Sequence, residues 1–334
     1  MTPPSAPASA HFRGKGVLIA GGLGFLGSNL ARTLVEAGAR VALADNLVPQ
    51  HGGNRFNVDG VESRLQIAIC DVRDQENLQR LVVNQDYLFN LVGQTSHMDS
   101  MQEPFVDLDI NARAQLAILE MCRQHNPAIK VVFASTRQVY GTPDYLPVDE
   151  RHAVRPVDIN GINKMAGESY HILYNSVYGL RTCALRLTNT YGPRMRVKDA
   201  RQTFLGLWIR LLVEGQPFEV WGGEQWRDFT YVDDMTEAFL LAASTDISNG
   251  KIYNIGGDRA VTLVQAADIA IAANGSGAYS VRPFPAERKR IDIGDYYADY
   301  RVIANDLGWA PRVSLEQGLE RTIRYYRDHL AKYL

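Results

Sequence analysis

Three glycines near the N-terminus have the spacing of a phosphate-binding turn. Gly21, Gly24 and Gly27 stand in the order G-x-x-G-x-x-G, directly between an apolar run and a helix-like stretch. Glycine permits a tight turn and a close approach of the backbone to a diphosphate, and the N-terminus of the next helix supplies amide donors and a positive dipole. The spacing therefore predicts a dinucleotide-binding site.

An acidic residue follows where such a site requires one. Asp45 ends the second apolar run, 18 residues after Gly27. A carboxylate there accepts hydrogen bonds from the adenosine ribose hydroxyls and repels a 2′-phosphate, so we predict NAD rather than NADP. Asp71, after the third apolar run, is placed to reach the adenine amino group, although an Asp in such a turn is equally a local cap.

These residues need strands and helices that bring them to one edge of a sheet. Strands are predicted for the apolar runs Lys15–Ala20, Val41–Ala44, Leu65–Cys70, Tyr87–Val92, Lys130–Ala134 and Leu180–Leu187. Helix-like segments lie between the runs, the first over Phe25–Ala37. Strands that are apolar on both faces and separated by helices indicate a parallel sheet covered on both sides. We predict an α/β fold with a Rossmann-type doubly wound sheet and a smaller, discontinuous C-terminal lobe.

The pattern changes after Asn189, where a basic, loop-rich stretch precedes a predicted helix over 204–214. Strands predicted at 229–232 and 252–255 return to the main body, and the tail over 314–330 has helical spacing. We therefore predict a flexible N-terminus over 1–12, an NAD-binding domain over 13–188 with returns near 229–257, and a mainly substrate-binding lobe over 189–334.

The composition excludes several classes of protein. The chain has 334 residues, 46% of them hydrophobic and 22% charged, with a net charge of −2, which is typical of a globular protein and gives no indication of nucleic-acid or membrane partners. No apolar stretch approaches the roughly 20 residues of a membrane helix, and residues 1–11 lack the apolar core of a signal peptide. The three cysteines are far apart, which predicts reduced thiols, no metal site and a cytoplasmic location.

Further motifs carry a family resemblance over Gly14–Tyr326. They are Asp45-Asn46, Asp71-Val72, Asn111, ASTRQVYG at 134–141, Lys164 with Glu168, RLTNTYGP at 186–193 and RDFTYVDD at 227–234. With these motifs the chain resembles the extended short-chain dehydrogenase/reductases, specifically the NAD-dependent sugar-nucleotide epimerase/dehydratase family. In such enzymes a sugar carbon gives a hydride to the nicotinamide while a base takes the hydroxyl proton, and the ketone is then re-reduced, dehydrated or decarboxylated.

The resemblance implies a set of site residues. The implied cofactor-binding residues are Gly21, Gly24, Phe25, Leu26, Gly27, Asp45, Asn46, Asp71, Val72, Leu91, Val92, Gln94 and Lys164. The implied substrate-binding residues are Thr136, Asn189, Thr203, Phe204, Glu219, Trp221, Arg227 and Arg288. Thr136 and Lys164 match the family's Ser/Thr, which bonds the substrate oxygen, and its Lys, which binds the nicotinamide ribose. The implied substrate is a nucleoside diphosphate sugar, with UDP-sugars favoured, and the family's helix pairing implies a homodimer.

One position departs from the family pattern in a way that bears on the chemistry. Asn160 stands where the family's catalytic Tyr is expected, and an amide has no accessible pKa for general-base catalysis. Three interpretations are open. In the first, another group moves the proton, and the candidates are Tyr140, His97, Asp99, or Lys164 acting through a water. In the second, the protein binds ligands without catalysis. In the third, Asn160 is an introduced substitution that traps substrate.

The residues after Thr136 bear on the reaction type. The family's 4,6-dehydratases have Asp-Glu there, whereas this chain has Arg137 and Gln138. Arginine is a permanent cation and glutamine does not titrate, which argues against dehydration. Epimerisation is therefore the predicted reaction, and decarboxylation of a uronic acid sugar nucleotide stays open because Arg137 would suit a carboxylate.

Overall fold

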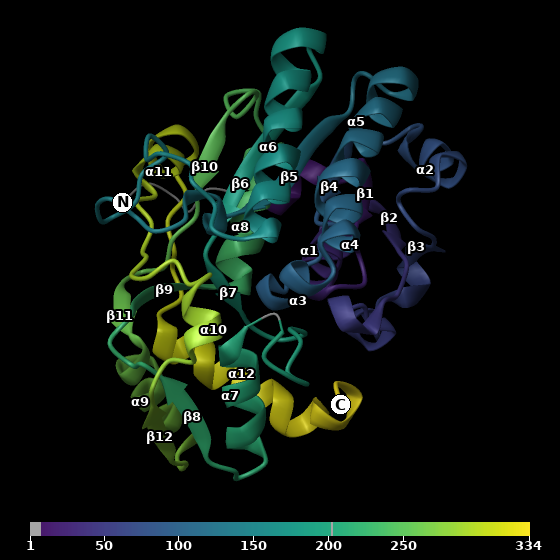
Figure 1. Cartoon of the computed structure of the whole chain (residues 1–334). Helices are drawn as coiled ribbons and strands as arrows, with labels where there is room; N and C mark the ends of the chain where they lie inside the picture. The colour runs from purple at the N-terminus through teal and green to yellow at the C-terminus, as the bar shows by residue number, and fades with distance from the viewer. Residues whose placement is uncertain (1–7, 202) are drawn as a thin grey trace, which may run out of the picture.

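The computed structural model describes residues 8–201 and 203–334 (Figure 1). Its strands are β1 (Gly16–Ala20), β2 (Arg40–Asp45), β3 (Leu65–Ile69), β4 (Tyr87–Asn90), β5 (Lys130–Thr136), β6 (Arg181–Leu187), β7 (Asn189–Tyr191), β8 (Phe218–Trp221), β9 (Trp226–Tyr231), β10 (Ile252–Asn254), β11 (Ala260–Thr262) and β12 (Tyr279–Arg282). Its helices are α1 (Phe25–Glu36), α2 (Gln75–Val82), α3 (His97–Gln102), α4 (Pro104–Leu108), α5 (Ala114–His125), α6 (Ile159–Tyr178), α7 (Phe204–Val213), α8 (Val232–Ala243), α9 (Leu263–Asn274), α10 (Ala286–Lys289), α11 (Arg301–Leu307) and α12 (Leu315–His329).

A seven-stranded sheet organises the first part of the chain. Its order is β10-β6-β5-β4-β1-β2-β3, and every neighbouring pair is parallel. The predicted Rossmann-type fold is confirmed, and the predicted strands match within two residues at each end. From β1 the chain adds β2 and β3 on one side of the sheet, and it then continues with β4 on the other side of β1. In open α/β sheets, ligands bind at such a switch point, in the crevice beyond the carboxyl ends of the two neighbouring strands.

Helices cover both faces of this sheet, which explains why most residues of its central strands are apolar and buried. On one face Leu34 of α1 and Phe239 of α8 belong to the same buried cluster as the sheet. On the other face Leu78 of α2, Ile118 of α5 and Tyr174 of α6 form a second cluster. Figure 1 shows α5 and α6 running side by side on this second face.

The second lobe is built around two small sheets, β11-β9-β7 and β12-β8. Helices α7, α9 and α12 pack together against them in a separate core. The expected return of the chain over 229–257 is made by α8 and β10, which joins the large sheet. The strand expected at 229–232 is part of β9, which lies in the second lobe and pairs with β7 and β11.

The start of the described chain differs from the flexible segment expected over 1–12, of which residues 1–7 lie outside the described part. Residues Ala8–Phe12 form a 3-10 helix. Phe12 is fully buried, and Nε2 of His11 lies 2.7 Å from the hydroxyl of Tyr87. Because Phe12 fills a gap between β4 and α8, the expectation is wrong for 8–12. Over the described ranges, no helix combines the length and the apolar character that crossing a bilayer requires.

Candidate active site

The glycine turn between β1 and α1 forms as the spacing predicts. Gly21 has a φ of +81°, which favours glycine, and a Cβ there would lie 2.9 Å from the carbonyl oxygen of Leu91. A Cβ on Gly27 would collide with the carbonyl oxygen of Gly21. Gly24 is the N-cap of α1, so the free amides of that helix face the same crevice. The turn is a bare-backbone cradle of the kind that fits a diphosphate.

Asp45 lies at the end of β2, at the wall of this crevice. Its carboxylate accepts hydrogen bonds from the backbone N–H groups of Leu23 (2.9 Å) and Leu47 (2.8 Å). Burial raises the pKa of Asp45, and these two bonds oppose that effect. Each carboxylate oxygen keeps lone pairs that can accept a ribose hydroxyl.

Asp71 forms an ion pair with Arg73 that the sequence did not indicate. Arg73 holds both of its oxygens, with Nε at 2.9 Å and Nη2 at 2.6 Å, and this contact lowers the pKa of Asp71 to about 2. The amide of Asn46 lies 3.4 Å away. Arg73 lines the crevice and was missed by the sequence analysis, because an Asp-x-Arg pair in a turn has no distinctive spacing.

Two adjoining pockets contain all the residues expected at the cofactor, and both are lined by Gly21, Gly24, His51, Leu91 and Gly93. The first pocket is also lined by Asp45, Asn46, Asp71, Val72 and Val92. The second is also lined by Phe25, Leu26, Gly27, Gln94, Thr136, Asn160, Lys164, Asn189 and Thr203. The first pocket and the glycine turn fit a dinucleotide, and the second pocket extends from its far end.

Lys164 of α6 reaches the place where the two pockets meet. Its Nζ donates to the carbonyl oxygens of Ala134 (3.1 Å) and Val92 (3.3 Å). Burial lowers the pKa of Lys164 to about 8, against a smaller opposite effect of Asp107. A Cβ on Gly93 would lie 2.7 Å from Nζ, so the glycine leaves room for the ammonium group.

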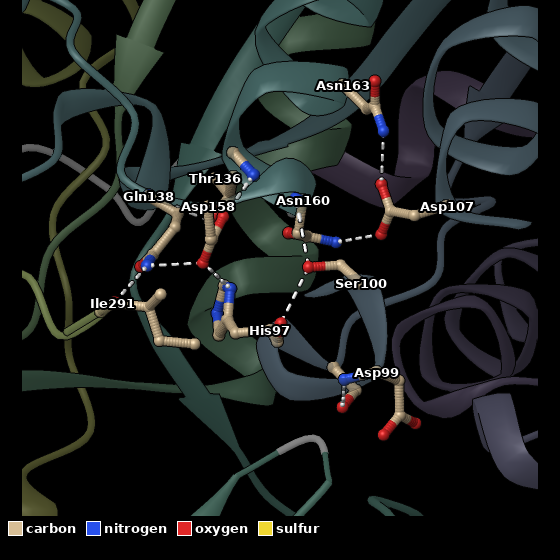
Figure 2. A network of polar contacts seen from close by, with 12 residues as sticks. His97, Asp99, Ser100, Asp107, Thr136, Gln138, Asp158, Asn160, Asn163 and Ile291 are labelled. Carbon is tan, nitrogen blue, oxygen red and sulfur yellow. Dashed lines mark hydrogen bonds and ion pairs between the residues drawn. The ribbon is translucent and has the colours of Figure 1, made fainter. Parts of the chain in front are cut away.

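Asn160 belongs to a cluster of amides around one buried carboxylate (Figure 2). Its Nδ2 donates to the carbonyl oxygen of Gln94 (2.7 Å) and to Oδ2 of Asp107 (3.0 Å). Asn163 and Asn111 donate to the same carboxylate, at 2.8 Å and 3.0 Å. Both amide hydrogens of Asn160 are therefore used, and Oδ1 is the atom left to accept a bond from a ligand. Asp107 has no motif around it, so the sequence does not point to its place in this cluster.

Tyr140 is unsuited to move a proton in this pocket. It is fully buried, its hydroxyl donates to Oδ1 of Asn254 and accepts from Arg186, both at 2.7 Å, and burial raises its pKa to about 12. Arg186 also forms a buried ion pair with Glu168 at 2.6 Å. This group of residues ties β6, β10 and α6 to the 3-10 turn that follows β5, rather than facing the pocket.

Two further candidates lie on α3. Asp99 carries its carboxylate 3.8 Å from Arg201, and in Figure 2 this carboxylate points away from Asn160. His97 lines the second pocket, and its Nδ1 lies 2.8 Å from Oδ2 of Asp158. The imidazole is therefore the better placed of the two.

Arg137 brings a cation to the same pocket. Nη2 donates to Oδ1 of Asn189 at 3.0 Å, and the guanidinium lies over the ring of Tyr296 at 5.2 Å. Nη1 is buried and has no hydrogen-bond partner within the described ranges. Burial lowers the pKa of Arg137, against an opposite effect of Asp228.

The structure brings only part of the expected substrate residues together. Asn189 and Thr203 line the second pocket with Thr136, whereas Phe204, Glu219, Trp221, Arg227 and Arg288 do not. Phe204 packs on Trp208 in the core of the second lobe. The guanidinium of Arg227 is held by Asp292 at 3.1 Å and by backbone carbonyls. Arg288 covers the ring of Trp221 at 4.5 Å.

Comparison with known proteins identifies relatives of the whole chain. Residues 17–256 match the model of the NAD dependent epimerase/dehydratase family. The chain is 31% identical to a protein of Methanocaldococcus jannaschii provisionally named as a UDP-glucose 4-epimerase, over 94% of this chain and 99% of that protein. It is 29% identical to UDP-glucuronic acid decarboxylase 1 of Xenopus tropicalis, over 95% of this chain and 73% of that protein.

A solved structure agrees with these relatives. The crystal structure of UDP-glucose 4-epimerase from Thermotoga maritima, determined with UDP-glucose, superposes with a TM-score of 0.85 at 30% identity, over 94% of this chain and 99% of that one. The match includes both the large parallel sheet and the second lobe. The chain belongs to the NAD-dependent epimerase/dehydratase family of sugar-nucleotide enzymes.

Proposed function

We propose that the protein modifies a nucleoside diphosphate sugar by transient oxidation at a sugar carbon, and that the net reaction is epimerisation. The observation that carries the proposal is the junction of the two pockets. The dinucleotide crevice ends where Lys164, Thr136 and Asn160 line the second pocket. A sugar in that pocket would therefore meet the reacting end of the cofactor. We propose UDP as the nucleotide because the relatives above are named for UDP-sugars.

Each side chain has a proposed task at this junction. NAD, when bound, supplies the hydride acceptor. Asp45 would accept bonds from the adenosine ribose, and Lys164 would donate to the nicotinamide ribose. The hydroxyl of Thr136 would bond the reacting sugar oxygen, and Oδ1 of Asn160 would orient the sugar without taking its proton. Asn160 suits this task because its amide is held by two acceptors, Gln94 and Asp107.

The nucleotide part of the substrate is proposed to bind between Asn189 and the second lobe. Asn189 and Thr203 already line the pocket, and Trp221 with Glu219 would receive the base. The ring face of Trp221 is covered by Arg288, so stacking of a base there requires the guanidinium to move. Arg227 and Arg288 are the proposed phosphate partners.

The chain's own residues favour epimerisation over dehydration. Gln138 stands where elimination of water would need a titrating group, and its amide donates to Asp158 at 3.0 Å. A glutamine in that bond neither takes nor gives a proton. Epimerisation needs only one group that removes and returns the hydroxyl proton.

Proton NMR of the purified protein with NAD and a panel of UDP-, GDP-, CDP- and dTDP-sugars tests the proposal. New anomeric signals would establish the enzyme and identify its substrate. Unchanged spectra, together with tight NAD and sugar-nucleotide binding by calorimetry, would show instead a binding protein without catalysis.

A second candidate function is action on an acidic sugar, by epimerisation or decarboxylation of a sugar nucleotide that carries a carboxylate. It is favoured by the buried Nη1 of Arg137, which lacks a partner in the described chain and lies beside Thr136. A carboxylate on the sugar would give that group a charged partner and offset its burial.

Replacing Arg137 with Met distinguishes acidic from neutral substrates. For an acidic sugar, we expect KM to rise by about 10² or more, since an unpaired buried charge on the ligand costs several kcal/mol. For a neutral sugar, removing an unpaired cation should change KM by less than about tenfold. Steady-state kinetics on the glucose and glucuronic acid forms of the same nucleotide would measure the difference, and equal KM changes on both would exclude this role.

We also propose a homodimer formed through α5 and α6. These helices lie side by side and expose apolar side chains at Leu116, Ile162, Leu173 and Val177. Sedimentation is expected to give twice the chain mass of 37.2 kDa. Val177→Asp should yield monomers, whereas Ile247→Asp, at another exposed apolar site, should not; dimers in both variants would place the interface elsewhere.

A further inference from the structure

A histidine and a buried carboxylate form a pair beside the proposed sugar pocket. Nδ1 of His97 lies 2.8 Å from Oδ2 of Asp158 (Figure 2), and the Asp158 side chain is fully buried while that of His97 is 38% exposed. His97 begins α3 and Asp158 is the N-cap of α6, the helix that carries Asn160 and Lys164. The pair therefore links the pocket to the helix that holds its other functional residues.

Asp158 is fixed by bonds other than the one to His97. Oδ1 accepts from the N–H of Gly161 at 2.6 Å, and Oδ2 accepts from Nε2 of Gln138 at 3.0 Å. Burial alone would raise the pKa of Asp158, but His97 and these donors lower it below its ordinary value. The carboxylate therefore stays ionised beside the imidazole.

His97 is also fixed through its backbone. Ser100 Oγ donates to the carbonyl oxygen of His97 at 2.7 Å and accepts from the N–H of Asn160 at 3.3 Å. Nδ1 of His97 is buried and lies at an ion-pair distance from Oδ2 of Asp158, although the contact lacks the geometry of a hydrogen bond. A proton held on Nδ1 would leave Nε2 to carry the lone pair of the ring. His97 lines the pocket together with Thr136 and Asn160, so a ligand there would lie beside its ring.

We propose that His97 is the proton-transfer residue of the sugar oxidation and that Asp158 is its positioning residue. This assignment rests on the proposed function. The O–H bond of the sugar hydroxyl breaks and its proton goes to Nε2 of His97, while the electron pair of that bond forms the C=O double bond. NAD held by the glycine turn and Lys164 would accept the hydrogen of the same carbon as hydride, so the two electrons lost by the sugar carbon would be taken up by the cofactor. His97 returns the proton when the hydride returns.

The neighbouring groups are less suited to this task. Asn160 has no proton to exchange and both its amide hydrogens are used. The ammonium of Lys164 already donates to two backbone carbonyls. Tyr140 is buried in the ion-pair group of Arg186, away from the pocket. Of the four side chains compared, His97 is the one that lines the pocket with an ionised carboxylate beside its ring.

Chemical rescue tests the assignment on the holoenzyme with its sugar nucleotide. We expect His97→Ala to lower kcat by about 10²–10⁴, with the dissociation constants of NAD and substrate, measured by calorimetry, within about threefold of wild type. Added imidazole should raise kcat of His97→Ala at least tenfold. His125→Ala, on an exposed part of α5, is the matched control and should show neither loss nor rescue.

A tautomer measurement provides a readout that does not depend on turnover. ¹⁵N NMR of the histidine rings, with His97 identified by its absence in His97→Gln, should show Nδ1 protonated and Nε2 free in the wild type at neutral pH. Asp158→Asn keeps the helix cap but removes the charge, and should shift His97 toward a mixture of tautomers.

The outcomes separate this inference from the proposed function. If the wild type converts no sugar of the panel, the proposed function fails and the base assignment fails with it. The proposed function stands but the assignment to His97 is overturned if the wild type is active and any one of three results is found. His97→Ala keeps its rate, or imidazole restores none of a lost rate, or His97 carries its proton on Nε2.

Discussion

Replacing Lys164 with Met is expected to lower kcat/KM by about 10³ or more while leaving the chain folded. The ammonium of Lys164 lies beside Val92 and Gly93, where the two pockets meet, and the pockets have no second lysine among the described residues that line them. In the proposed role of Lys164, loss of this charged donor from a desolvated site removes both its bonds to the cofactor ribose and its electrostatic effect on the reacting oxygen. Initial rates and a calorimetric dissociation constant for NAD would measure both losses.

The same substitution should change how stability depends on pH. Because the pKa of Lys164 is lowered from 10.5 to about 8, the unfolded chain binds more protons at this lysine between pH 8 and 10.5. The free energy of unfolding of the wild type therefore rises by roughly 3 kcal/mol as the pH rises through that window. Below pH 8 the full cost of burying the protonated ammonium remains. Lys164→Met lacks this gain, so its stability relative to wild type should fall by that amount in urea titrations from pH 8 to 10.5.

Lys130→Met is the matched control for this prediction. Lys130 is also a buried lysine, but it begins β5 and its Nζ bonds to Ser248 and to the carbonyl of Thr245, far from the pockets. The Lys130→Met protein should keep its activity. Equal loss of activity in both variants would show that a buried lysine matters for folding rather than for the site.

Removing Glu168 is expected to cost about 3–5 kcal/mol of folding free energy. Its carboxylate is paired with Arg186 at 2.6 Å and accepts the hydroxyl of Ser135 at 2.7 Å, and both charged side chains are about 5% exposed or less. Glu168→Ala leaves the guanidinium of Arg186 buried without its counter-ion. Chemical denaturation with circular dichroism would measure the loss.

An exposed ion pair provides the comparison for Glu168. Glu76 and Arg80 pair on the surface of α2, with side chains 78% and 69% exposed. Glu76→Ala should change the free energy of unfolding by less than about 1 kcal/mol. If Glu168→Ala cost no more than Glu76→Ala, the buried pair would not be the element that ties β5, β6 and α6 together.

The cofactor crevice was predictable because its signals are local in the sequence. The glycine spacing, the strand before it and the helix after it lie within about 20 residues, and Asp45 ends the next strand. Parallel strands bring their carboxyl ends to one edge, so the expected cofactor residues meet there whatever the details of packing.

The partners that decide the chemistry came only from the tertiary structure. Asp107 receives amides from Asn111, Asn160 and Asn163, and its place in the sequence shows no pattern that points to them. Arg227, expected at a phosphate, is paired with Asp292, which lies 65 residues away. A charged side chain takes whichever partner burial leaves within reach, and that choice depends on elements distant in the chain.

The sequence by itself determined the fold, the dinucleotide crevice and the absence of a tyrosine at position 160. The tertiary structure decided which groups can act in its place. In the folded protein Tyr140 is buried beside the ion pair of Arg186 and Glu168, the carboxylate of Asp99 points away from Asn160, and His97 lies beside Asp158. These outcomes depend on solvent exclusion and on contacts between α3, α6 and β5, because burial fixes which polar groups are already satisfied and which remain free to bind a substrate.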